Sequence, residues 1–149
     1  MPAFITFGRV LFALLFIYTG ATKLFDIQTT TSAIAAKVAI PALLTPYTSQ
    51  IETVTGMTTP QLLAIAIGAF EIIAGLMIAL NFGARFFAIL LIFFVAVATF
   101  YFHDFWNQPS PENGRVLVEA LKNLSIIGAL FMIAGYGRRT READQAYEV

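Results

Sequence analysis

The chain has 149 residues, of which 58% are hydrophobic and 12% are charged, and its formal net charge is zero. An average soluble domain carries roughly 25% charged residues, so this composition indicates one membrane-embedded domain without an electrostatic basis for nucleic-acid binding. The absence of cysteine excludes disulfide exchange, thiolate-bound iron–sulfur clusters and cysteine nucleophiles.

Four apolar stretches are long enough to cross a bilayer as helices. A hydrocarbon core of ~30 Å needs ~20 apolar residues, and no stretch shows the alternation of a barrel strand. The sequence therefore predicts an all-α integral membrane four-helix bundle that forms a single transmembrane domain over residues 1–149. Its parts are the spans 4–25, 61–80, 84–102 and 116–136, a long connection at 26–59 and a tail at 137–149.

The first span carries two basic residues on one helical face. Arg9 and Lys23 lie on a 4-3-4-3 spacing with small and aromatic residues between them. They are separated by about 21 Å along a helix, so at least one must reach the interface or find an anion inside the membrane. An arginine before an apolar run, with residues 19–21 as a small-residue site, also resembles a signal peptide. We favour a retained helix because the polar set described below uses both cations.

The connection at 26–59 is too long for a plain turn. Residues 29–40 are expected to form a short helix, with Ser32 or a neighbouring threonine as its N-cap. The apolar segment 41–47 is expected to lie on the membrane surface, where it could cover one end of the bundle.

The second span has one ionisable residue, Glu71, at its midpoint. A carboxylate in that position costs roughly 3 kcal/mol, so we expect it to have a partner or a function. The small residues on its face allow another helix to approach closely. The sequence predicts a structural ion pair between Glu71 and a cation of the first span, Arg9 or Lys23. A functional role, such as proton relay, remains open beside this structural one.

Local signals delimit the second and third spans. Thr59 is expected to be the N-cap of the second span, with Pro60 at the first helical position. Residues 81–83 form a short turn, so the second and third spans are expected to make an antiparallel hairpin.

The third span ends in an aromatic stretch, residues 100–106, which contains the single histidine, His103. An aromatic belt at the outer interface explains this stretch most simply. His103 can titrate near neutral pH, but we expect no metal site because there is no second histidine and no cysteine.

Residues 109–114 predict a loop before the fourth span, which opens with three polar residues on one face: Glu119, Lys122 and Asn123. An exposed salt bridge worth under ~1 kcal/mol is the alternative to a functional role. If the polar ends of the spans converge, they form an outer pocket for a quinone or another small molecule. Its predicted residues are Lys23, Glu71, His103, Glu119, Lys122 and Asn123, with Phe100 and Trp106 as walls.

Two segments resemble the DoxX family. Residues 8–26, GRVLFALLFIYTGATKLFD, are similar to its opening signature, and residues 68–88, GAFEIIAGLMIALNFGARFFA, to its second helix and hairpin. The aromatic-histidine stretch and the Lys-Asn pair also fit. The resemblance covers most of the chain except the 26–59 connection and the last residues, and the order and spacing of the motifs are more specific than any one of them.

The resemblance implies a four-helix protein of the bacterial inner membrane. Some relatives are subunits of quinone-linked oxidoreductases, including a thiosulfate:quinone enzyme, and others belong to oxidative-stress complexes, while most have no established activity. The family positions that carry over by motif are Arg9, Lys23, Glu71, His103, Lys122 and Asn123. The chain lacks an appended soluble domain, so membership alone does not supply catalysis.

Three functions follow from these expectations. The first is a quinone-linked membrane subunit without its own redox cofactor, with quinone as its ligand and a soluble or membrane oxidoreductase subunit as its partner. The second is a non-catalytic membrane anchor or assembly factor. The third is a small proton-coupled transporter that acts as a homo-oligomer. In each case the bilayer is a partner, and the basic residues near the span ends favour both termini in the cytoplasm.

Overall fold

The computed structural model describes residues 2–146, and side chains are described for residues 3–136. No strand occurs among the described residues, so the predicted all-α fold class is confirmed. The elements, in chain order, are α1 (Pro2–Phe25), α2 (Ile27–Lys37), the 3-10 turn η1 (Ala42–Leu44), α3 (Thr45–Thr55), α4 (Thr59–Ala79), α5 (Ala84–Phe102), the 3-10 turn η2 (Phe105–Asn107) and α6 (Glu112–Ala146).

Four of these helices are long and apolar enough to cross a membrane: α1, α4, α5 and α6. They coincide with the four predicted spans, and α5 has the predicted bounds. The fourth differs most, because α6 starts at Glu112 and continues past Tyr136 to Ala146. Residues 113–114, expected in a loop, therefore belong to its first turn. The predicted tail is helical as far as residue 146, and residues 147–149 lie outside the described part.

The chain divides into two compact units, which are described separately. The first comprises residues 1–13 and 74–149, and the second comprises residues 14–73. Helices α1 and α4 contribute to both units. Many large apolar side chains on the four long helices are exposed, as expected for helices that face lipid.

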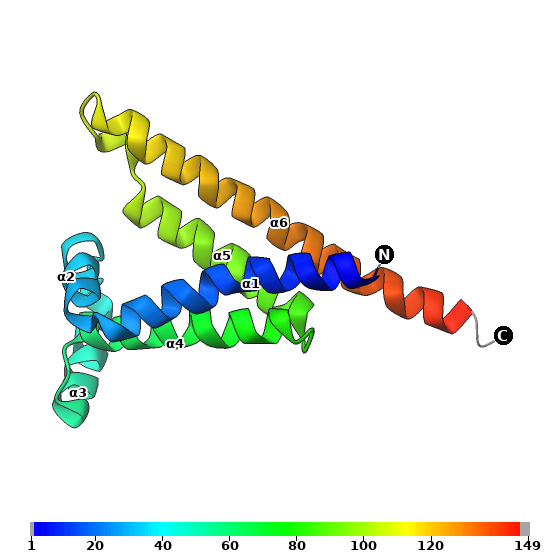
Figure 1. Ribbon diagram of the computed structural model, residues 1–149. Helices are drawn as coiled ribbons and strands as arrows, with labels where there is room; N and C mark the ends of the chain where they lie inside the picture. The colour runs from blue at the N-terminus through cyan, green and yellow to red at the C-terminus, as the bar shows by residue number, and fades with distance from the viewer. Residues whose placement is uncertain (1, 147–149) are drawn as a thin grey trace. The chain divides into compact units, whose positions relative to one another are not determined.

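In the second unit, α2 and α3 lie at the end where α1 finishes and α4 begins (Figure 1). The predicted short helix exists as α2, but its N-cap is Asp26, whose Oδ1 accepts the Thr29 N–H at 3.2 Å. The predicted cap, Ser32, lies inside the helix and donates to the Gln28 carbonyl at 2.9 Å. The prediction of the cap was wrong because Asp26 directly follows the last residue of α1 and starts the next helix sooner.

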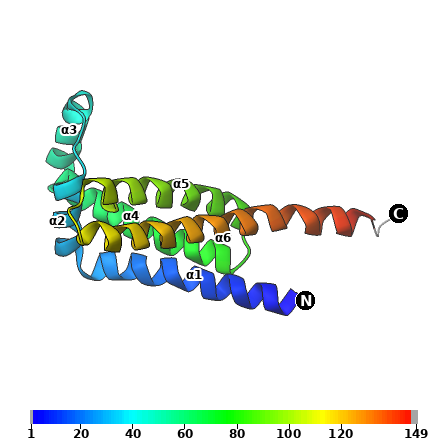
Figure 2. The same ribbon diagram turned by 90° about the horizontal axis from the view of Figure 1, so that it is seen from above.

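The third helix, α3, was not predicted, and it runs across the direction of α4 (Figure 2). Pro46 lies in its first turn, and Gly56 ends it in the left-handed conformation with φ 69°. Glu52 then joins α3 to α4: its Oε1 accepts both the N–H and the hydroxyl of Thr59 at 2.6 Å. Thr59 is thus the first residue of α4, and its hydroxyl donates to Glu52 instead of accepting from α4 as an N-cap would.

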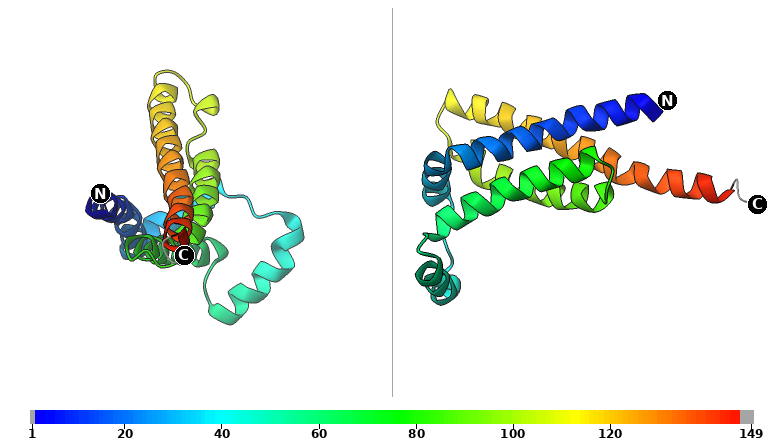
Figure 3. Two further views of the ribbon diagram at one scale, coloured as in Figure 1. Left: turned by 90° about the vertical axis from the view of Figure 1, so that its right-hand side faces the viewer. Right: turned by 60° about the horizontal axis from the view of Figure 1, so that its bottom comes forward.

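In the first unit, the end of α4 leads into α5 through a turn in which Asn81 and Gly83 both have φ 58°. Helices α5 and α6 run antiparallel, side by side (Figure 3), and η2 packs against α6. Small and aliphatic residues four or three positions apart form the buried stripe of α5: Ala84, Ala88, Leu91 and Val95. Because α5 and α6 run antiparallel, the last turn of α5 and the first turns of α6 lie at the same end of this helix pair.

Candidate functional site

The Glu71 carboxylate forms an ion pair inside the second unit. Lys23 Nζ donates to Glu71 Oε2 at 2.7 Å and to the Thr19 carbonyl oxygen at 3.4 Å. The Glu71 side chain is 5% exposed and that of Lys23 is 31% exposed. Lys23 is one of the two donors that the sequence predicts for Glu71. The buried carboxylate thus has a compensating charge, as an ionisable group within a span requires.

Close backbone packing of α1 against α4 brings these two side chains together. A Cβ atom at Gly20 would lie 2.6 Å from the Gly68 carbonyl oxygen and 2.9 Å from the Glu71 Cβ. A Cβ at Gly68 would lie 2.8 Å from the Leu24 side chain. A side chain at Gly20 would clash with the backbone of α4, whereas one at Gly68 would first require the Leu24 side chain to move. The structure thus shows that the small residues beside Glu71 permit this contact.

Arg9 belongs to the first unit, where its Nε is buried without a hydrogen-bond partner among the described residues. The predicted pairing of Arg9 with Glu71 stays a prediction, since Glu71 forms its ion pair with Lys23. The predicted single pocket also stays a prediction, because Lys23 and Glu71 lie in one unit and its other residues lie in the other.

The first unit brings together the remaining polar residues that the sequence singled out. Lys122 Nζ donates to Glu119 Oε1 at 2.7 Å, and both side chains are largely exposed, at 62% and 52%. His103 directly follows α5 as its C-cap and has a weak electrostatic interaction with Glu119. The ion pair and the histidine thus lie at the same end of the α5–α6 pair, and we name these three residues the α5–α6 cluster: His103, Glu119 and Lys122.

Asn123 lies beside this cluster and contacts α5. Its Nδ2 donates to Thr99 Oγ1 at 2.9 Å, and the Thr99 hydroxyl donates to the Val95 carbonyl at 2.6 Å. This chain of hydrogen bonds holds α6 against α5 one turn below His103. Sequence reasoning missed Thr99, because its partner is twenty-four positions away on another helix.

Three aromatic rings at the end of α5 and in η2 contact one another. The Phe100 and Trp106 rings have centroids 5.6 Å apart, and the Phe105 and Trp106 rings have centroids 5.0 Å apart in an edge-to-face arrangement. Phe100 and Trp106 remain exposed. The two predicted wall residues therefore contact each other at the α5–η2 corner and present apolar surface at the end of the helix pair that also carries the cluster.

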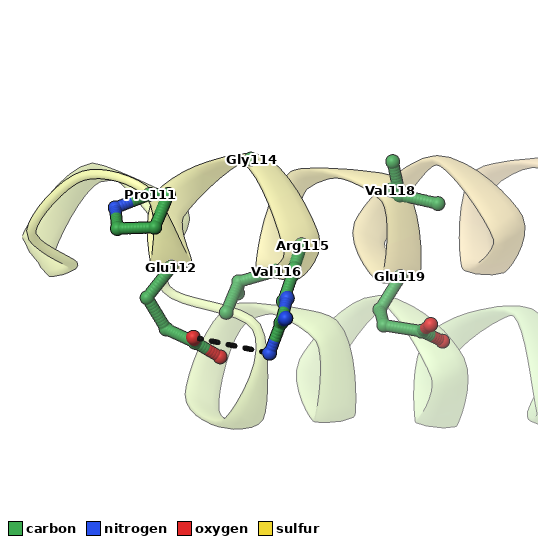
Figure 4. A pocket seen from close by; sticks show the side chains of 7 residues that line it. All are labelled: Pro111, Glu112, Gly114, Arg115, Val116, Val118 and Glu119. Carbon is green, nitrogen blue, oxygen red and sulfur yellow. Dashed lines mark ion pairs between the residues drawn. The ribbon is translucent and has the colours of Figure 1, made fainter.

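A hollow of about 540 Å³ opens along the first turns of α6, lined by Pro111, Glu112, Gly114, Arg115, Val116, Val118 and Glu119 (Figure 4). Glu112, Arg115, Val116 and Glu119 extend toward the same side of α6. The dashed contact is the 3.8 Å ion pair between Glu112 and Arg115. Of the predicted pocket residues, this hollow includes only Glu119, so a small molecule held there would also contact residues that sequence reasoning did not select.

No metal-binding constellation occurs in the described part of the chain: no group of three or more His, Asp or Glu side chains is clustered there.

Comparison with known proteins places the chain in a family. Its sequence matches the DoxX family over residues 4–104. It is similar to the inner membrane protein YphA of Escherichia coli (strain K12), with 26% identity over 133 residues, covering 89% of this chain and 82% of that protein. No solved structure matches. With four helices suited to membrane crossing and a family match over two thirds of its length, the chain is a multi-pass membrane protein that belongs to the DoxX family.

Proposed function

We propose that the protein is the membrane subunit of a quinone-linked oxidoreductase, and that the α5–α6 cluster binds the quinone head group. The observation that supports this proposal is that the α5–α6 cluster and the Phe100–Trp106 ring contact occupy the same end of the antiparallel α5–α6 pair. Ligand sites of this kind combine apolar walls with a few convergent polar groups.

The residues fit the chemistry of the ligand. The carbonyl oxygens of a quinone accept hydrogen bonds, and the His103 ring and the Lys122 ammonium group supply donors. The exposed aromatic rings supply apolar contact for the ring of the head group. Because the cluster lies at the end of a membrane-spanning helix, a quinone with its tail in the bilayer would reach it from the lipid side.

The bound quinone would accept electrons and protons when it is reduced to the quinol. The electrons are supplied by a partner oxidoreductase subunit under this proposal. Under this proposal, the chain's own residues orient the head group, and His103 acts as the proton donor, a role that histidine often takes in proteins. Lys122 holds Glu119 in place through their ion pair.

The test is ligand-dependent thermal stability. The protein in nanodiscs is titrated with a soluble ubiquinone analogue and with a soluble menaquinone analogue, and unfolding is followed by intrinsic tryptophan fluorescence. We expect a saturable increase in Tm with one of them, because a ligand that binds only the folded state stabilises it. His103→Ala should abolish the increase.

Ser125→Ala is the matched control, since Ser125 is an exposed polar residue of α6 whose hydroxyl donates only to the Leu121 carbonyl of its own helix. It should keep the full shift. No shift with either quinone, or an equal shift in wild type and His103→Ala, contradicts the proposal.

A second function, a non-catalytic membrane anchor or assembly factor, is favoured by a different observation. Glu71, the one buried charged residue in the part of the chain whose side chains are described, is already paired with Lys23 beside the close Gly20–Gly68 contact. A pair of this kind fixes the register of two helices and requires no ligand. Purification in mild detergent, followed by identification of the proteins that accompany the chain, would reveal the complex that either function requires.

We also infer that the protein resides in the bacterial inner membrane with both termini in the cytoplasm. The relative named above is an inner membrane protein. The basic residues near the ends of the spans support the orientation, since cytoplasmic loops are enriched in lysine and arginine.

A further inference from the structure

Helix α3 is amphipathic, and its apolar face is left exposed by the described part of the chain. Tyr47, Ile51 and Val54 follow a helical spacing on α3, and Leu43 and Leu44 precede them in η1; we name these five residues the α3 apolar face. All five are exposed, and Leu43 and Val54 reach 82% and 86%. Serine, threonine and glutamate occupy the opposite side. No residue of α3 is buried, so packing within the chain does not explain this face.

The α3 apolar face also lacks charge. Glu52 is the only charged residue between residues 38 and 60, and it lies on the polar side of α3. Its carboxylate is turned to α4, where it accepts the two Thr59 hydrogen bonds. There is no basic residue on α3 that could contact an acidic protein surface or an anionic lipid. An occupant of this face is therefore recognised through apolar contact alone.

The position of α3 identifies that occupant. Only residues 56–58 separate α3 from α4, whose membrane-spanning segment begins at Thr59. The Glu52–Thr59 contacts fix the end of α3 to this point. Helix α3 runs across the direction of α4 (Figure 2), so a bilayer that α4 crosses along its axis would have its surface along α3. The apolar face of α3 therefore lies on a helix joined directly to the start of a membrane-spanning helix.

We propose that α3 is an in-plane membrane helix whose apolar face inserts into the interfacial region of the bilayer at the start of α4. Helices of this kind lie with the apolar face about 5–10 Å deep, between the headgroups and the acyl chains. Because its apolar face is uncharged, α3 binds a zwitterionic bilayer as well as an anionic one. This inference does not depend on the proposed quinone site.

The absence of cysteine makes a direct test possible. Ile51→Cys and Val54→Cys on the apolar face, and Ser49→Cys on the polar face, are each labelled with a nitroxide in phosphatidylcholine proteoliposomes. Residues 49 and 51 are separated by about 200° around a helix, so this pair is matched in position along the axis and opposed in face. Electron paramagnetic resonance then measures collisions of each label with oxygen, which partitions into lipid, and with a water-soluble nickel complex.

We expect the oxygen-to-nickel collision ratio to be several-fold higher at residues 51 and 54 than at residue 49. Adding phosphatidylglycerol should leave these ratios unchanged. Low oxygen-to-nickel ratios that are equal at residues 49 and 51 would place α3 in water, and high ratios that are equal would bury both faces in lipid; either result overturns the proposal. Shielding of residues 51 and 54 from both reagents would show that a second copy or another protein covers the face. Insertion only in the presence of phosphatidylglycerol would show that recognition depends on charge, which also contradicts the proposal.

Discussion

The Glu71 carboxylate is nearly shut off from solvent, whereas Lys23 keeps about a third of its side chain exposed. This difference in exposure determines which of the two substitutions costs more stability. Without the carboxylate, the lysine head can turn toward water along its flexible stem. Without the lysine, the carboxylate remains buried with its charge uncompensated.

We therefore expect Lys23→Met to destabilise the protein more than Glu71→Gln. The first should cost about 3–5 kcal/mol, as for a broken buried pair, and the second about 1–3 kcal/mol, as for a lost charged hydrogen bond. Reversible unfolding in mixed detergent micelles measures both. Lys122→Met is the matched control, since its ion pair has the same 2.7 Å length but is exposed, and should cost under ~1 kcal/mol.

A larger loss for Glu71→Gln than for Lys23→Met would contradict this account. If Glu71→Gln leaves stability unchanged, the carboxylate has a role other than helix pairing, and this result would favour the proton-coupled transporter.

Glu52 gives a pH dependence outside the membrane-spanning segments. The side-chain and backbone hydrogen bonds from Thr59 hold the pKa of Glu52 below its ordinary value of 4.5. A carboxyl group with a lowered folded-state pKa stabilises the fold above its unfolded-state pKa, and this contribution disappears as the pH falls through the folded-state value. We expect wild type to lose stability relative to Glu52→Gln as the pH falls below about 4.5. Thermal unfolding of both proteins between neutral and acidic pH measures the difference.

A difference in Tm between the two proteins that stays constant across this pH range would contradict the prediction, because it would mean that the Glu52–Thr59 hydrogen bonds do not depend on the charge of Glu52.

At the scale of elements, α1 and α4 depend on two positions without side chains. The Gly68 carbonyl oxygen lies only 2.6 Å from the position that a Cβ atom of Gly20 would take. Larger residues force such interfaces apart, typically at a cost of about 1–3 kcal/mol.

We expect Gly20→Ala to lower stability by about this amount and also to weaken the Lys23–Glu71 contact, since the same packing aligns both. Gly128→Ala is the control, because a Cβ there meets no atom within 4 Å. It should be neutral or slightly stabilising, since alanine is the better helix former. Unfolding of the two variants under identical conditions gives the comparison, and equal effects would contradict the role of Gly20.

At the scale of the whole molecule, the sequence predicts those elements whose position depends on hydropathy alone. The four long helices follow from runs of apolar residues, because only helices satisfy their own backbone groups in lipid. Helix α3 was missed because its Thr-rich sequence has weak helix propensity and mixed polarity. The signals that mark it, Pro46 in the first turn and Gly56 at the end, were present in the sequence.

The candidate site was predictable only in part, for a related reason. Helical spacing placed Glu119 and Lys122 on one face, since that information lies within a single helix. The Thr99–Asn123 hydrogen bond depends on how two helices are aligned, and spacing within either helix carries no such information. The predicted orientation of the termini stays a prediction, because it rests on the distribution of basic residues alone.

The Lys23–Glu71 pair has a consequence for how the protein responds to membrane potential. Moving one elementary charge through ~100 mV requires about 2.3 kcal/mol. A lysine and a glutamate 2.7 Å apart carry no net charge, so the field exerts almost no net force on them as a unit. Motions that keep the two side chains together are electrically silent, and only a step that separates them would be driven by voltage.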